Sequence, residues 1–327
     1  MQERTLKTAT ETKHTATSAI LIANPTSGNY LQNVQQIQDA LHYLHEHGWH
    51  AELRLTQSAG DAKRLAREAV EQKIEVVVAV GGDGTINEII QELAGSETAL
   101  GVLPSGTVNV WAREVGIPLD NEGARKVLVE GQIRHIDLGQ INERYFLLMA
   151  GIGFDGEITH AVEKKSLKRL GIFGYLLMAT WLGFGYNGFR SFIQMEGRII
   201  RANTLQIVVG NTQLYAGAMK YTWQAKCDDG LLDICIVRKR GRLERLLMVK
   251  DLLLHHQQQR SQWIRYETGK EIKIRTRQAI AIQIDGDAMG HTARGYPPTV
   301  IRVAPGALKV LVPQQLSPEI FVERREE

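Results

Sequence analysis

The spacing of apolar residues changes along this chain and divides it into two parts. In the first part, apolar runs such as Ser18 to Ala23 and Val76 to Val80 alternate with segments such as Ala59 to Gln72, where apolar residues recur at helical spacing. Continuous apolar runs are typical of strands buried on both faces. Strands that alternate with helices are typical of a parallel sheet covered by helices. Residues 18–135 are therefore predicted to form an α/β domain.

Past about Gly131 most strand-like segments follow one another without a helix between them, which predicts an antiparallel sandwich or meander over residues 136–313. The expected strands are Ile133 to Leu138, Tyr145 to Ala150, Gly197 to Gly210, Leu231 to Val237, Glu271 to Asp285 and Thr299 to Val312. Helices are expected over Gly156 to Gly185 and Leu243 to Gln258. Residues 314–327 are a candidate to pack back on the first domain.

Length and composition support two soluble globular domains and exclude several classes of protein. The chain has 327 residues, and its 39 Lys and Arg against 36 Asp and Glu give a net charge of +3, which does not indicate a nucleic-acid-binding protein. Only Cys227 and Cys235 are present, so a disulfide scaffold is excluded and a reducing, cytosolic setting is expected. Residues 1–17 are rich in Thr, Lys and Glu, lack the apolar core of a signal peptide, and are expected to form a disordered arm.

The strongest candidate for chemistry follows the apolar run at Val76 to Val80. Residues 81–85 read GGDGT, and a helix is expected from Ile86 onward. Glycines let the backbone approach a bulky anion, and the N-terminus of a helix favours phosphate. The carboxylate of Asp83 makes sense in such a place if Mg²⁺ accompanies the phosphates. A plain strand-to-helix turn is the alternative, and the buried strand with the enclosed carboxylate favours a phosphate site.

Two more polar loops follow buried strands. NPTSG at residues 24–28 follows the run that ends at Ala23, and PSGT at residues 104–107 follows the run ALGVL at residues 99–103. The carboxyl ends of parallel strands meet at one edge of a sheet, where ligands bind in open α/β sheets. The three loops are therefore expected to converge on a nucleotide.

Acidic residues at three places could also take part in chemistry. The DGD turn at residues 285–287 follows an alternating strand, and its paired carboxylates suit either a general base with a metal partner or an ordinary hairpin turn. DDG at residues 228–230 is open to the same two interpretations, as a cation site or a turn. Asp137 lies where the pattern changes and could face a cleft between the domains.

The segment Leu170 to Phe189 is uncharged and long enough to span a bilayer, although it contains five glycines and an asparagine. Three interpretations stay open: a core helix followed by a loop, an apolar wall that accepts a lipid or touches a membrane surface, and a spanning helix. Basic runs at residues 164–169 and 238–242 would suit anionic headgroups, although such runs are commonly solvated faces.

Several motifs together resemble the diacylglycerol kinase family of lipid kinases, which includes the sphingosine kinases and soluble bacterial relatives. They occur in the family's order and cover most of residues 18–312. The matching motifs are NPTSG at 24–28, Thr56 with GDA at 60–62, GGDGTINE at 81–88, LPSGTVN at 103–109, GIGFD at 151–155, CDDGLLD at 227–233 and IDGD at 284–287. GGDGT alone is shared with NAD kinases and, more loosely, phosphofructokinases, whereas the LPSGT and DDG motifs are more specific to the lipid kinases.

This resemblance implies an NAD kinase- and phosphofructokinase-like α/β domain followed by a β-sandwich domain, with the active site in the cleft between them. It also implies that the protein transfers the γ-phosphate of ATP to a lipid hydroxyl with the help of Mg²⁺. The residues at positions that would hold ATP are Asn24, Ser27, Gly28, Thr56, Gly81, Gly82, Gly84, Thr85, Ser105, Gly106 and Thr107.

The resemblance further implies catalytic roles for three acidic residues. Asp83 would organise the catalytic Mg²⁺ through water, and Asp137 would belong to the same network. Asp287 stands where the family usually carries the glutamate that deprotonates the lipid hydroxyl. The acceptor would be diacylglycerol or a related lipid.

A second, structural Mg²⁺ would lie near the DDG turn in a bacterial member of the family. Its ligand would be Asp229, with the carbonyls of Lys226 and Leu231 as further candidates. The expected partners of the protein are a lipid substrate and a membrane surface that it touches peripherally, and a homodimer is left open.

Two positions depart from the family pattern. The turn reads DGD where the family usually has DGE, so the carboxylate of Asp287 is one methylene shorter, and Val110 stands where the family commonly has Asp. Two rivals stay open: an NAD kinase-like enzyme, which would have the same phosphate loop, and a catalytically silent nucleotide- or lipid-binding module. The apolar segment favours a lipid acceptor over NAD, and the shortened side chain of Asp287 keeps the silent module open.

Overall fold

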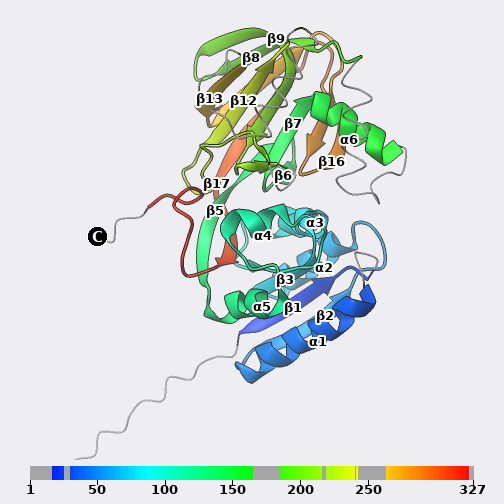
Figure 1. The fold of residues 1–327 in the computed structure, drawn as a ribbon, viewed down its shortest axis with the longest axis vertical. Coiled ribbons are helices and arrows are strands. Elements are labelled where there is room, and N and C mark those ends of the chain that lie inside the picture. Colours follow the sequence, from blue (N-terminus) through cyan, green and yellow to red (C-terminus); the bar gives the residue numbers. More distant parts are fainter. Residues whose placement is uncertain are drawn as a thin grey trace, which may run out of the picture.

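The computed structural model describes residues 17–25, 30–164, 185–215, 219–239, 241 and 263–323. Ser27 and Gly28 lie outside the described residues, as do the expected arm up to residue 16 and the expected helix at Leu243 to Gln258. Figure 1 shows the described chain as two units, one above the other, with long strands running between them.

The first unit is a parallel sheet accompanied by helices, as the sequence pattern predicts. Its strands lie in the order β4 (Ala99–Pro104), β3 (Val76–Gly81), β1 (Ser18–Ala23) and β2 (His50–Leu55), and each pairs in parallel with its neighbour. The helices are α1 (Tyr30–Glu46), α2 (Asp61–Glu71), α3 (Asp83–Leu93), α4 (Val110–Val115) and α5 (Asn121–Glu130). Every residue of β3 is buried, which explains its continuous apolar run.

The second unit is an antiparallel β-sandwich with the helix α6 (Phe154–Lys164) beside it. Its strands are β5 (Gln132–Ile141), β6 (Arg144–Phe146), β7 (Met149–Gly153), β8 (Phe189–Met195), β9 (Arg198–Gly210), β12 (Leu232–Arg238), β13 (Ile264–Gly269), β14 (Glu271–Thr276), β15 (Ala281–Ile284), β16 (Asp287–His291) and β17 (Thr299–Val312). β10 (Leu214–Tyr215) and β11 (Met219–Lys220) form a separate short hairpin. Isoleucines such as Ile193, Ile207 and Ile284 fill the interior of the sandwich.

The strand prediction for the second unit is right in outline and wrong in detail. The expected strand at Tyr145 to Ala150 is divided between β6 and β7, and the one at Glu271 to Asp285 is divided between β14 and β15. The second division is hidden in the sequence, because Ile280 is buried and continues the alternation past an exposed loop at residues 277–279. β8, β13 and β16 are absent from the prediction.

The apolar segment at Leu170 to Phe189 lies outside the described residues except for positions 185–189. Over the described ranges, the structure contains no helix with the length and apolar character needed to cross a membrane.

Strands β5 and β17 join the two units (Figure 1). The first part of β17 pairs with β14 of the sandwich, and Lys309 and Val310 near its end pair in parallel with β4 of the first sheet. β5 runs antiparallel to β17 through both parts, with a shift of register between Ala304 and Leu308. The units are therefore connected by continuous hydrogen-bonded strands, which hold the cavity between them in a defined geometry.

The chain beyond β17 returns to the border of the two units. Ile320 and Phe321 are buried, and the N–H of Cys227 donates to the carbonyl of Ile320 at 2.9 Å. The guanidinium of Arg134 lies over the ring of Phe321, 5.8 Å from its centre. These contacts secure the C-terminal segment next to the DDG turn.

Candidate active site

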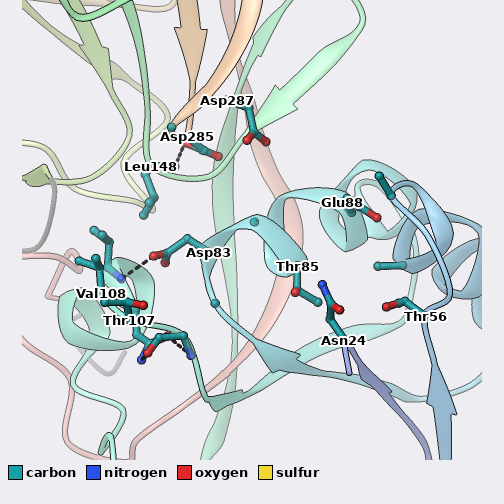
Figure 2. Close-up of a pocket in the computed structure, with 18 of the residues that line it drawn as sticks. Asn24, Thr56, Asp83, Thr85, Glu88, Thr107, Val108, Leu148, Asp285 and Asp287 are labelled. Carbon is teal, nitrogen blue, oxygen red and sulfur yellow. Dashed lines mark hydrogen bonds between the residues drawn. The ribbon is translucent and has the colours of Figure 1, made fainter. Parts of the chain in front are cut away.

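A cavity of about 990 Å³ lies between the two units. Loops that follow β1, β2, β3 and β4 form one wall, and the start of β7, the strand β10 and the turn between β15 and β16 form the other. Figure 2 shows Asp285 and Asp287 on the sandwich side of this cavity, with Asp83, Thr85 and Asn24 on the α/β side. The sequence-predicted residues that line the cavity are Asn24, Thr56, Gly82, Asp83, Gly84, Thr85, Gly106, Thr107 and Asp287.

The loops after β3 and β4 pack against each other at their glycines. A Cβ atom on Gly106 would lie 2.5 Å from the Cα atom of Gly82, so a larger residue would push the loops apart. Asn109 closes the second loop, because its Oδ1 accepts a hydrogen bond from the N–H of Gly106 at 3.0 Å and its Nδ2 donates to the Gly106 carbonyl at 2.8 Å. Both loops thereby present bare backbone to the cavity, as the binding of a phosphate chain requires.

Asp83 connects the first of these loops to the helix that follows the second. Its Oδ2 accepts a hydrogen bond from the N–H of Val110 at 3.0 Å, and its Oδ1 accepts one from the N–H of Trp111 at 3.1 Å. The carboxylate therefore caps the first turn of α4. Burial raises the pKa of Asp83, and the backbone N–H donors oppose this rise.

Asp285 holds the start of β7 in place. Its carboxylate accepts hydrogen bonds from the N–H groups of Leu147 (2.8 Å), Leu148 (3.0 Å) and Met149 (2.9 Å). Burial raises its pKa to about 7, the three N–H donors oppose the rise, and the negative charge of Asp83 adds to it. Two carboxylates that repel each other across a cavity, and whose oxygens are hard ligands, suit the binding of Mg²⁺.

Asp287 is held in the cavity by one residue from each unit. Its Oδ2 accepts a hydrogen bond from Nδ2 of Asn87 on α3 at 3.0 Å, and it forms an ion pair with Nη2 of Arg144 at 3.3 Å. Asn87 is almost completely buried, whereas the side chain of Asp287 is 28% exposed. The predicted base is therefore open to the cavity and oriented by a residue of the GGDGTIN motif.

Sequence reasoning missed these supporting residues. Asn87 belongs to the GGDGTINE motif, which could have drawn attention to it, whereas no pattern marks Arg144 as a partner of Asp287. Glu88 of the same motif also lines the cavity, and its Oε2 accepts a hydrogen bond from the N–H of Gly60 at 3.1 Å.

Two predicted ATP-binding residues lie beside the cavity and do not line it. Gly81 ends β3 under the side chain of Thr85, and its carbonyl accepts a hydrogen bond from the N–H of Ser105 at 3.0 Å. Ser105 lines a much smaller neighbouring pocket. Both residues therefore shape the loops and are not turned to the cavity.

The structure does not bring Asp137 to the cavity. Its carboxylate is buried and accepts hydrogen bonds from the N–H of Gly230 at 2.6 Å and from the N–H of Gly306 at 2.7 Å. Asp137 thereby fastens the DDG turn to the bulge of β17. Burial raises its pKa, and the negative charge of Asp228 adds to the rise.

The residues predicted for a structural Mg²⁺ also lie at this border. Oδ1 of Asp229 accepts a hydrogen bond from the N–H of Leu231 at 2.9 Å, and Nζ of Lys226 donates to the carbonyls of Pro318 and Phe321. No set of three His, Cys, Asp or Glu side chains within the described ranges is arranged to hold a metal ion. The structural Mg²⁺ stays a prediction, as does the catalytic role of Asp137.

Two family models match the chain. The model of the diacylglycerol kinase catalytic domain matches residues 18–141, and the model of the YegS C-terminal NAD kinase beta sandwich-like domain matches residues 149–312. Diacylglycerol kinases of Staphylococcus aureus strains JH9 and Newman are each 31% identical to the chain over 274 residues, which are 83% of this chain and 86% of theirs.

Two crystal structures from Bacillus anthracis str. Sterne share the fold. One, described as a diacylglycerol kinase, aligns with a TM-score of 0.71 at 22% identity and covers 91% of this chain and 97% of its own. The other aligns with a TM-score of 0.75 at 24% identity over the same shares of the two chains.

Proposed function

This chain belongs to the diacylglycerol kinase family, and we propose that it transfers the γ-phosphate of ATP to the hydroxyl group of diacylglycerol or a related lipid in the cavity between its two domains. One observation carries this proposal. Asp287 from the sandwich and the glycine loops from the α/β domain line the same cavity, although more than 170 residues separate them in the chain.

The α/β domain, taken as residues 18–135, would bind ATP. Residues of the loops after β3 and β4 line the cavity together with Asn24, Thr56 and Thr85. Backbone N–H groups at the start of α3 favour the negative charge of the phosphates. Because Asp83 caps α4, it keeps both loops in one arrangement while ATP enters.

The sandwich domain, taken as residues 136–313, would bind the acceptor. Leu148, Met149, Leu214 and Tyr215 give its side of the cavity a largely apolar wall. Asp287 would accept the proton of the lipid hydroxyl, whose oxygen then bonds to the γ-phosphorus while the bond to the β,γ-bridging oxygen breaks and ADP leaves. Asn87 and Arg144 keep the carboxylate of Asp287 oriented for this step.

Carboxylate oxygens in the cavity fit a requirement for Mg²⁺. Asp83 would hold the ion through water, because both of its oxygens already accept backbone hydrogen bonds. Asp285 would add negative charge to the same site while its oxygens stay bonded to the start of β7. When bound, Mg²⁺ neutralises the phosphate charge that develops during transfer. Since the acceptor is a lipid, peripheral contact with a membrane surface is part of the proposal.

The test is the transfer of labelled phosphate from ATP in the presence of Mg²⁺. The acceptors offered would be diacylglycerols, sphingoid bases, ceramide and, as a polar control, NAD. We expect a labelled diacylglycerol or related lipid, and no product with Asp83→Ala. Labelled NAD would favour an NAD kinase-like enzyme, and ATP binding without any labelled product would favour a silent binding module.

A further inference from the structure

Asp155 is a buried carboxylate that stands one layer behind the acceptor side of the cavity. It lies in the first turn of α6, is 2% exposed, and does not line the cavity. Its polar partners in the described part of the chain come from two other elements. Oδ1 accepts the hydroxyl of Tyr215 on β10, and Oδ2 accepts Nε2 of Gln283 on β15 at 2.7 Å.

Both partners of Asp155 line the cavity, and one of them reaches the turn that carries Asp287. Oε1 of Gln283 accepts a hydrogen bond from the N–H of Gly286 at 2.9 Å. The side-chain amide of Gln283 therefore links the buried carboxylate to the backbone next to Asp287. Gly151 makes room for this pair, since a Cβ atom on it would meet both Asp155 and Gln283.

Burying a carboxylate costs free energy, and Asp155 is not needed to attach the helix α6 to the sandwich. The helix α6 is already attached to the β15–β16 hairpin elsewhere. The ring of His160 bonds to the carbonyls of Ile282 and Gly290, and the N–H of Ala288 donates to Glu163 at 3.0 Å. Burial raises the pKa of Asp155 to about 6, and the bonds from Tyr215 and Gln283 oppose the rise.

We propose that Asp155 is a positioning residue for the acceptor: it anchors the hydroxyl of Tyr215, which keeps this ring in the acceptor side of the cavity, and, through Gln283, it fixes the turn that presents Asp287. Tyr215 is further held from the side by the ring of Tyr221, whose centre lies 5.2 Å away at an angle of 89°. The role rests on the proposed lipid kinase function, because it assigns a task to the acceptor half of the same site.

The experiment compares Asp155→Asn and Tyr215→Phe with Ser191→Ala. Ser191 forms a buried hydrogen bond with Thr204 at 2.6 Å inside the sandwich and does not line the cavity, so its variant controls for a general loss of packing. We expect both test variants to lower kcat/KM for the lipid by about tenfold or more and to leave KM for ATP within about twofold. The double variant should have a kcat/KM for the lipid no lower than that of the less active single variant, because the two residues act as one unit.

Hydrogen exchange of the backbone around residues 283–290 provides a readout that does not need catalysis. Asp155→Asn should speed exchange there, while Ser191→Ala leaves it unchanged. Unchanged lipid kinetics in Asp155→Asn, or lipid and ATP parameters that fall together as stability falls, would overturn the assignment.

The two proposals can fail separately. A wild-type protein that phosphorylates no lipid would refute the kinase function. Hydrogen exchange of residues 283–290 would then still show whether Asp155 fixes the turn. An exchange rate in Asp155→Asn equal to that of the wild type would refute this positioning role as well.

Discussion

The two acids of the DGD turn have different tasks, although they are only two residues apart. Asp285 has a φ of 47° and turns its carboxylate back to three N–H groups at the start of β7. Asp287 instead extends into the cavity and meets Asn87 of the other domain. Asp285 therefore shapes the wall of the cavity, whereas Asp287 is available to act as the proposed base.

Asn87→Ala tests whether that interdomain contact matters. Without Nδ2 of Asn87, Asp287 loses an oriented partner, so we expect kcat to fall by about tenfold while KM for ATP stays unchanged. Asn121→Ala is the matched control, because Nδ2 of Asn121 also donates a hydrogen bond, to the carbonyl of Gln36 at 3.2 Å, but neither residue touches Asp287 or lines the cavity. Steady-state kinetics that show equal losses in both variants would refute the orienting role.

At the scale of elements, the proposed nucleotide side depends on two loops that can approach because each carries a glycine at the contact. A Cβ atom on either Gly82 or Gly106 would meet the Cα atom of the other, and Asn109 and Asp83 fix the chain on either side. A short helix, α4, begins at this contact and ends near Glu114, whose carboxylate accepts the N–H groups of Gln213 and Leu214. The same helix therefore connects the two glycine loops to the strand β10, which lines the opposite wall of the cavity.

Gly106→Ala should separate the loops. The new methyl group would meet Gly82 at 2.5 Å and Oδ1 of Asn109 at 2.7 Å, so we expect ATP affinity, measured by titration calorimetry, to fall about tenfold or more. Gly101→Ala is the control, since its methyl group would crowd Leu128 at 2.6 Å in the core of the same domain. If both variants lose stability and both keep the ATP affinity of the wild type, the loops tolerate a methyl group at Gly106 and the prediction is wrong.

Some features of the site could be predicted from the sequence and others could not. The polar loops after β1, β3 and β4 could be predicted, because buried strands followed by glycine and polar residues carry a local signal. The partners of Asp287 could not, since Arg144 and Asn87 are 143 and 200 residues away from it. The position of Asp137 in the sequence suggested that it could face a cleft between the domains, and the family resemblance placed it in the catalytic network. Its two N–H partners, on Gly230 and Gly306, depend on the path of β17.

At the scale of the whole molecule, buried acids lie along the border between the two domains. Burial raises the pKa values of Glu114, Asp233 and Asp285 to about 7. Because the folded state then keeps these protons to a higher pH than the unfolded chain, their contribution to stability is fully present below about pH 4 and is lost as the pH rises to 7.

The free energy of unfolding should therefore fall between about pH 4 and pH 7. Glu114→Gln should make this fall smaller by on the order of 3 kcal/mol, because glutamine does not titrate. The measurement is thermal or denaturant unfolding of both proteins across this range without Mg²⁺. Parallel curves for the two proteins would contradict the raised pKa of Glu114.

The central claim is that Asp287 accepts the proton of a lipid hydroxyl while the α/β domain holds ATP. Its most direct test is a single-turnover measurement of phosphate transfer from labelled ATP to diacylglycerol by Asp287→Asn, together with the affinity of that variant for ATP. We expect ATP affinity within about twofold of wild type and transfer slowed by about 10² to 10⁴. Transfer at the wild-type rate would contradict the assignment of Asp287 as the base.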